Sequence, residues 1–150
     1  MENKVFDGII LDLDGTLWNP TPLAANAYNR AIEITHANSK KITAEILQQE
    51  FGKPMHKIAL DLWPDIPDQE RDKLVECVLS EEQKELENIT TDVSYPGVID
   101  TLKQLSKSVN LYVVSNCHEG YMQVAIDKTH ISPYIKDYEY FGRTEKPKDE

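Results

Sequence analysis

The feature that most constrains the fold is a set of three short apolar segments that alternate with helical patterns. The segments occupy residues 9–11, 110–115 and 138–141. Strands that alternate with helices favour a parallel sheet with right-handed crossovers. The first segment is apolar without alternation, which is typical of a strand buried on both faces of such a sheet. The sequence therefore predicts an α/β fold.

A block of helical patterns interrupts this alternation directly after the first strand. Apolar residues recur in it at three- and four-residue intervals, and no alternating strand pattern occurs between Pro20 and Asp92. We therefore expect an all-helical insertion at residues 19–92, with residues 1–18 and 93–150 forming the sheet domain. Capping residues, prolines and glycines place its helices near residues 22–35, 43–51, 55–62 and 68–88.

The charge of the chain excludes several classes of partner. Its formal net charge is -10 and its pI is about 4.8, so DNA, RNA and anionic membranes are not expected to bind it. The sequence contains no long apolar stretch and does not begin like a signal peptide, which predicts a cytoplasmic protein. The two cysteines, Cys77 and Cys117, lack the spacing of a zinc site or a disulfide framework.

Polar side chains follow each predicted strand at the point where the strand ends. In parallel α/β sheets, ligands bind at the carboxyl ends of the strands. The side chains expected there are therefore candidates for a common site. They are Asp12, Asp14 and Thr16 after the first strand, Ser115 and Asn116 after the second, and Lys146 a few residues after the third.

These residue types suit phosphoryl transfer. The Asp12 carboxylate can attack phosphorus as a nucleophile, and Asp14 can act as general acid and then general base. Ser115 can donate a hydrogen bond to a phosphoryl oxygen, and Lys146 can neutralise charge in the transition state. A phosphate dianion approaching two carboxylates also requires a hard cation with oxygen ligands, such as Mg²⁺.

Three motifs in this order resemble those of the haloacid dehalogenase-like superfamily. LDLDGTL resembles the family's first motif, VVSN its second, and the pair Lys146-Pro147 its third. The resemblance implies a Rossmann-like core and an aspartyl-phosphate mechanism. It also implies that Mg²⁺ is bound by the side chain of Asp12 and the main-chain carbonyl of Asp14. Thr16 and Asn116 would then contact the substrate.

The helical insertion resembles the cap of one branch of this superfamily, which contains phosphoglycolate phosphatase and β-phosphoglucomutase. The segment FGKP at residues 51–54 is similar to a cap segment of that branch. Such caps are mobile and select the substrate, so Lys53 and Arg30 are candidates to bind its non-reacting part. The resemblance stops before the family's fourth, acidic motif. The core is therefore expected to be incomplete at its C-terminus, with one edge of the first strand unpaired.

The function predicted from these features is Mg²⁺-dependent hydrolysis of a small phosphorylated metabolite. A sugar-phosphate mutase of the same family is an alternative that the sequence does not separate from it. A non-catalytic phosphate- or metal-binding domain is a second alternative, should the natural chain have 150 residues. Dehalogenation ranks last, because it needs neither Mg²⁺ nor a second aspartate. Trp18 is expected to pack between core and cap, and Cys117 and His118 are assigned no chemistry.

Overall fold

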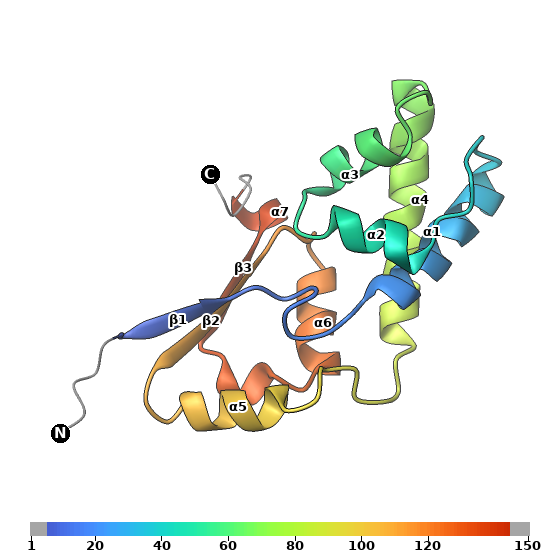
Figure 1. Cartoon of the computed structure of the whole chain (residues 1–150). Helices are drawn as coiled ribbons and strands as arrows, with labels where there is room; N and C mark the ends of the chain where they lie inside the picture. Colours follow the sequence, from blue (N-terminus) through green and yellow to red (C-terminus); the bar gives the residue numbers. More distant parts are fainter. Residues whose placement is uncertain (1–5, 145–150) are drawn as a thin grey trace. The chain divides into compact units, whose positions relative to one another are not determined.

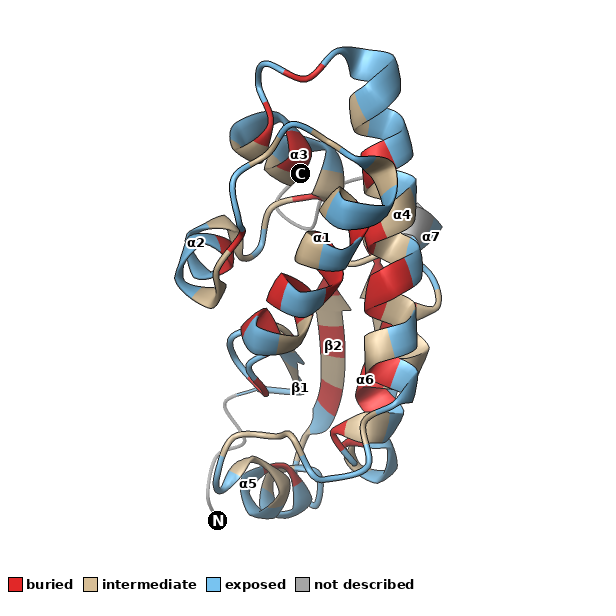
Figure 2. Cartoon of the chain, turned by 90° about the vertical axis from the view of Figure 1, so that its right-hand side faces the viewer, coloured by how far each residue is buried: buried red, intermediate tan, exposed pale blue. Residues whose placement is uncertain are grey.

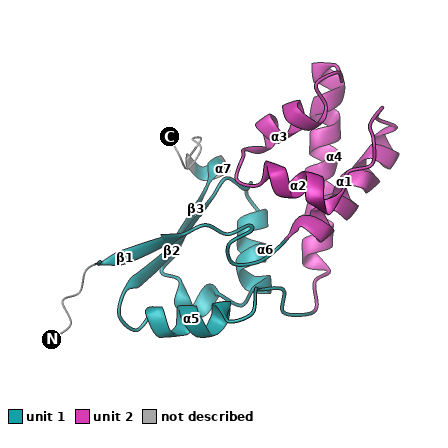
Figure 3. Ribbon diagram, viewed as in Figure 1, with its two compact units in different colours: residues 1–19, 91–150 teal, residues 20–90 magenta. Residues whose placement is uncertain are grey.

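A computed structural model of the chain describes residues 6–144 and divides the chain into two compact units. One unit comprises residues 1–19 and 91–150, and the other comprises residues 20–90 (Figure 3). The sequence placed these boundaries after residue 18 and before residue 93. The helical unit is thus an insertion into the chain of the sheet unit.

The sheet unit contains a parallel three-stranded sheet in the order β1-β2-β3, so the predicted α/β fold is confirmed (Figure 1). Helices separate the strands along the chain, as right-handed parallel crossovers require. Its elements in chain order are β1 (Gly8–Leu11), α5 (Val98–Leu105), β2 (Asn110–Ser115), α6 (Tyr121–Lys128), the 3-10 turn Ser132–Tyr134, β3 (Asp137–Tyr140) and α7 (Phe141–Thr144).

One face of the sheet is buried and the other is open. Along β2, Leu111, Val113 and Ser115 are buried while the residues between them are only partly buried, and Figure 2 shows this alternation as bands. On the open face Ile10, which pairs with Tyr112, is 72% exposed. The prediction that the first strand is buried on both faces is therefore wrong. The reason is that the part of the chain described by the structure leaves this face uncovered.

The first strand lies at the edge of the sheet, as predicted. Among residues 6–144, β1 pairs with β2 alone, while β2 pairs with strands on both sides. A strand with one unpaired edge presents main-chain donors and acceptors along that edge.

Because only one face of β2 is covered, we expect a change from valine to threonine to alter the free energy of unfolding differently on the two faces. Val113→Thr would bury a hydroxyl on the covered face and is expected to lower the free energy of unfolding by about 2 kcal/mol. Val114→Thr places the same hydroxyl on the open face, and an effect within about 0.5 kcal/mol is expected there. Urea denaturation of both variants measures the difference. Equal losses would show that the second face is covered in solution.

The helical unit is formed by four helices around its own apolar core. Helix α1 packs against α2 and α4, and α3 packs against α4. Thr43 caps the second helix, as its sequence predicts, because its hydroxyl oxygen accepts a hydrogen bond from the amide of Ile46. The helices are α1 (Thr21–Thr35), α2 (Ala44–Glu50), α3 (Met55–Leu62) and α4 (Asp68–Glu87). Within residues 6–144, no helix has the length and apolarity needed to cross a membrane.

The third strand ends one residue earlier than predicted. It was expected to run to Phe141, but α7 begins there. The Arg143 guanidinium donates a hydrogen bond to the carbonyl of Tyr138 and lies 3.5 Å from the Glu139 carboxylate. These contacts link α7 to β3.

Candidate active site

The candidate site is formed where β1 and β2 end at the same edge of the sheet. Asp12 directly follows β1, and Ser115 is the last residue of β2. Because the strands are parallel and Leu11 pairs with Val113, both carboxyl ends face the same edge. Ser115 and Asn116 are buried, and Asp12 and Asp14 are partly buried. These four residues therefore occupy the position at which ligands bind in parallel α/β sheets.

A tight turn after β1 fixes the two aspartates. The carbonyl of Leu13 accepts hydrogen bonds from the amides of Thr16 and Leu17, at 3.2 and 2.9 Å. Gly15 has a φ of 78°, a left-handed conformation that glycine adopts without strain, and its amide donates to the carbonyl of Trp18 at 2.8 Å. The turn holds residues 12 and 14 close to the end of β1.

Each aspartate accepts a hydrogen bond from a defined donor. The Leu13 amide donates to Oδ1 of Asp12 at 2.9 Å. Oδ1 of Asp14 accepts from the indole Nε1 of Trp18 at 2.9 Å and from the hydroxyl of Tyr121 at 2.7 Å. The Tyr121 contact joins the turn after β1 to the first residue of α6, 107 positions further along the chain.

The segment after β2 forms the second part of the site. Oγ of Ser115 accepts a hydrogen bond from the amide of Cys117 at 3.3 Å. The imidazole of His118 packs beside the ring of Tyr121, with centroids 5.6 Å apart. Burial lowers the pKa of His118, so this side chain is neutral at physiological pH. A neutral ring here adds no positive charge to the site.

Other predicted site residues lie elsewhere or outside the described part of the chain. Lys146 lies outside the described residues, and Thr16 is exposed in the turn after β1. Lys53 and Arg30 belong to the helical unit.

The two candidate substrate contacts, Lys53 and Arg30, form ion pairs within the helical unit. The ammonium of Lys53 lies 2.6 Å from carboxylate oxygens of Asp61 and Glu50, and hydrogen bonds to these two groups raise the pKa of Lys53. The guanidinium of Arg30 lies 3.8 Å from Glu81 and 4.0 Å from Glu85. A substrate anion would have to compete with these carboxylates for either side chain.

The oxygen donors at the sheet edge fit a cation that keeps several of its own waters. Within residues 6–144, no group of three or more acidic, histidine or cysteine side chains gathers around a point. The oxygen donors after β1 include the carboxylates of Asp12 and Asp14 and main-chain carbonyls of the turn. Mg²⁺ commonly binds through one or two carboxylates together with phosphate oxygens and waters, so this donor set is compatible with Mg²⁺.

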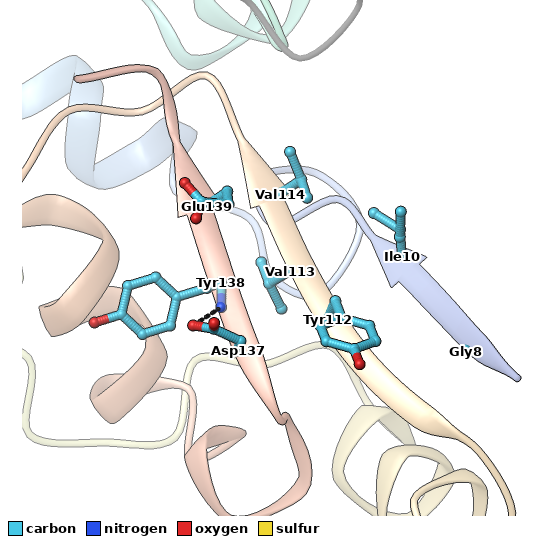
Figure 4. Close-up of a pocket in the computed structure, with 8 residues that line it drawn as sticks. All are labelled: Gly8, Ile10, Tyr112, Val113, Val114, Asp137, Tyr138 and Glu139. Atoms are coloured by element: carbon cyan, nitrogen blue, oxygen red, sulfur yellow. Dashed lines mark hydrogen bonds between the residues drawn. The ribbon is translucent and has the colours of Figure 1, made fainter. Parts of the chain in front are cut away.

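A pocket of about 430 Å³ lies on the open face of the sheet and is separate from the residues predicted to react (Figure 4). It is lined mainly by apolar groups, including Ile10, Tyr112 and Val114. None of the candidate site residues lines it. Its chemistry gives no reason to place a phosphate ester there.

The sequence matches the profile of the haloacid dehalogenase-like hydrolases over residues 6–149. This match spans nearly the whole chain. The protein therefore belongs to the haloacid dehalogenase-like hydrolase family.

Solved structures share the fold at low sequence identity. A predicted phosphoglycolate phosphatase from Haemophilus somnus superposes with a TM-score of 0.76 and 22% identity, over 92% of this chain and 63% of that one. A haloacid dehalogenase-like hydrolase from Streptococcus pneumoniae superposes with a TM-score of 0.74 and 20% identity, over 89% of this chain and 60% of that one. A protein provisionally named β-phosphoglucomutase from Thermotoga maritima superposes with a TM-score of 0.60 and 21% identity, over 91% of this chain and 62% of that one.

This chain spans less than two thirds of each of these three solved structures. Among curated proteins, no match to the chain is found. At these identities the superpositions show the fold alone.

Proposed function

We propose that the chain belongs to a phosphatase that hydrolyses a small phosphomonoester metabolite through a phosphorylated Asp12, with Mg²⁺ as cofactor. The observation that carries the proposal is the position of Asp12 and Asp14 in one tight turn after β1, at the edge where β2 ends in Ser115. The names of the Haemophilus and Thermotoga proteins, both tied to phosphate esters, support the same chemistry.

In the first half of the reaction, a carboxylate oxygen of Asp12 attacks the phosphorus atom. A bond forms between Asp12 and phosphorus as the bond from phosphorus to the ester oxygen breaks, and the electron pair stays on that oxygen. Asp14 gives its proton to the same oxygen, so the product leaves as a neutral alcohol. The Ser115 hydroxyl and the Asn116 amide donate hydrogen bonds to the transferring group.

In the second half, water attacks the phosphorylated Asp12. Asp14, now ionised, takes one proton from the water while the water oxygen forms its bond to phosphorus. The bond between phosphorus and Asp12 breaks, and its electron pair restores the carboxylate. The sum is one ester and one water converted into one alcohol and one hydrogen phosphate.

The Asp12 carboxylate and the Asp14 main-chain carbonyl would hold the Mg²⁺ ion. When bound, the ion offsets the repulsion between the carboxylates and the phosphate dianion. Lys146 is assigned the role of neutralising negative charge on the oxygens of the phosphoryl group in the transition state.

The helical unit is assigned the role of a substrate-selecting cap. Lys53 and Arg30 are its candidate contacts to the non-reacting part of the substrate, and each would exchange a carboxylate partner for the substrate anion. The cytoplasmic location stays a prediction from the sequence.

The test is phosphate release by the natural-length polypeptide from a panel of small phosphomonoesters, with Mg²⁺ and with EDTA. Phosphate release from at least one ester is expected, and EDTA should lower its rate by at least about 100-fold. Interconversion of sugar phosphates without net phosphate release would identify a mutase instead. Phosphate binding without turnover would favour the non-catalytic alternative.

A further inference from the structure

Two aromatic side chains donate hydrogen bonds to the same oxygen of Asp14. The Tyr121 hydroxyl lies 2.7 Å from Oδ1, and the Trp18 indole Nε1 lies 2.9 Å from it. Both distances are typical of strong hydrogen bonds to a carboxylate. Two donors at one oxygen restrict both the position and the rotation of the carboxyl group.

Both donors are themselves held rigidly by packing. Trp18 is 1% exposed and Tyr121 is 5% exposed, and their ring centroids lie 6.3 Å apart. The Trp18 backbone also forms a β-bridge with Ser94, and the His118 ring packs beside Tyr121 with centroids 5.6 Å apart. Two buried, packed side chains therefore present their donors to Asp14 from fixed positions.

A buried hydroxyl or indole N–H needs a hydrogen-bond acceptor, but this need alone does not explain why both donors bond to Asp14. A main-chain carbonyl would satisfy either donor equally well. Here the two donors, Trp18 and Tyr121, are 103 positions apart in the sequence. Both bond to one carboxylate in the turn after β1. That carboxylate is the group to which the proposed reaction assigns both proton transfers.

We propose that Tyr121 and Trp18 are positioning residues that aim the Asp14 carboxyl group at the leaving oxygen of the ester. The proposal rests on the proposed phosphatase function and names the groups that make its acid step efficient. A general acid contributes only when it lies within hydrogen-bond reach of the atom it protonates. Loss of a donor would let the carboxyl group rotate away from that atom.

The proposal predicts a dependence on the leaving group. An alkoxide is strongly basic and needs a proton as it leaves, whereas p-nitrophenolate leaves without one. Tyr121→Phe keeps the ring and removes only the hydroxyl. It is expected to lower kcat/KM for an alkyl phosphate by about 10-fold and for p-nitrophenyl phosphate by less than about 3-fold. The ratio kcat/KM is used because it reports the steps up to phosphorylation of Asp12, before Asp14 acts as a base.

Tyr112→Phe is the matched control, since it removes the same hydroxyl from the open face of the sheet, and both rates should stay at the wild-type level. A double-variant cycle with Asp14→Asn provides the second test. If Tyr121 acts through Asp14, adding Tyr121→Phe to Asp14→Asn should cause no further loss with the alkyl ester.

Equal losses with both esters, or full additivity in the cycle, would overturn the positioning role while the phosphatase proposal stands. If the wild-type protein releases phosphate from no ester of the panel, the proposed function fails, and the positioning role fails with it.

Discussion

Replacing Asp12 by asparagine is expected to lower the rate of phosphate release by on the order of 10⁴-fold or more, as removal of a covalent nucleophile does. An amide oxygen is too weak a nucleophile to attack phosphorus. The fold should survive, because Oδ1 of Asp12 accepts a hydrogen bond from the adjacent Leu13 amide, and an asparagine oxygen can accept the same bond. Phosphate release and thermal melting measure the two effects.

Asp7→Asn is the matched control for this change. Asp7 is an exposed aspartate just before β1, at the end of the strand opposite to Asp12. The same chemical change there should leave the rate unaltered. Undiminished Mg²⁺-dependent release by Asp12→Asn would rule out the proposed nucleophile. A variant that loses its melting transition would instead place Asp12 among the residues needed for folding.

The secondary structure could be predicted well where the signal is local. Helix α3 has the predicted bounds, residues 55–62, because its apolar spacing and the flanking prolines mark both ends. The second strand also has its predicted bounds, residues 110–115. Its apolar run lies between polar residues at each end.

The exposure of Ile10 could not be predicted in the same way. A run of apolar residues shows that a strand can be buried on both faces, but burial depends on what packs against each face. In the described part of the chain only one face of β1 and β2 is covered. Nothing in the sequence of the strand itself records which face remains open.

The contact between Tyr121 and Asp14 was also missed. The sequence placed Asp14 in the site, but it gave no reason to single out a tyrosine 107 positions away. The packing of Trp18 between core and cap stays a prediction, and the hydrogen bond from its indole to Asp14 within the sheet unit was not foreseen. The one available signal was the position of Tyr121 at the start of the helix after the second motif. A side chain there lies near the carboxyl ends of the strands.

Replacing Asp14 by asparagine is expected to lower kcat/KM for an alkyl phosphate by about 10²- to 10³-fold, the range that general acid catalysis contributes. Asparagine cannot protonate the leaving oxygen. Binding of Mg²⁺ should persist, because the proposed ligand at this position is the main-chain carbonyl. The fold should also persist, since an amide oxygen can accept the hydrogen bonds of Trp18 and Tyr121. Steady-state kinetics and isothermal titration with Mg²⁺ measure these effects.

Asp14→Asn is expected to lose less activity than Asp12→Asn because the two carboxylates have different roles. Without Asp12 no covalent intermediate forms, whereas without Asp14 water can still supply a proton, less efficiently. Asp137→Asn is the matched control, because Asp137 is exposed at the start of β3, opposite to the carboxyl ends of the strands. A wild-type rate in Asp14→Asn would remove Asp14 from the mechanism. Loss of Mg²⁺ binding in the same variant would show that its side chain, and not its carbonyl, is the ligand.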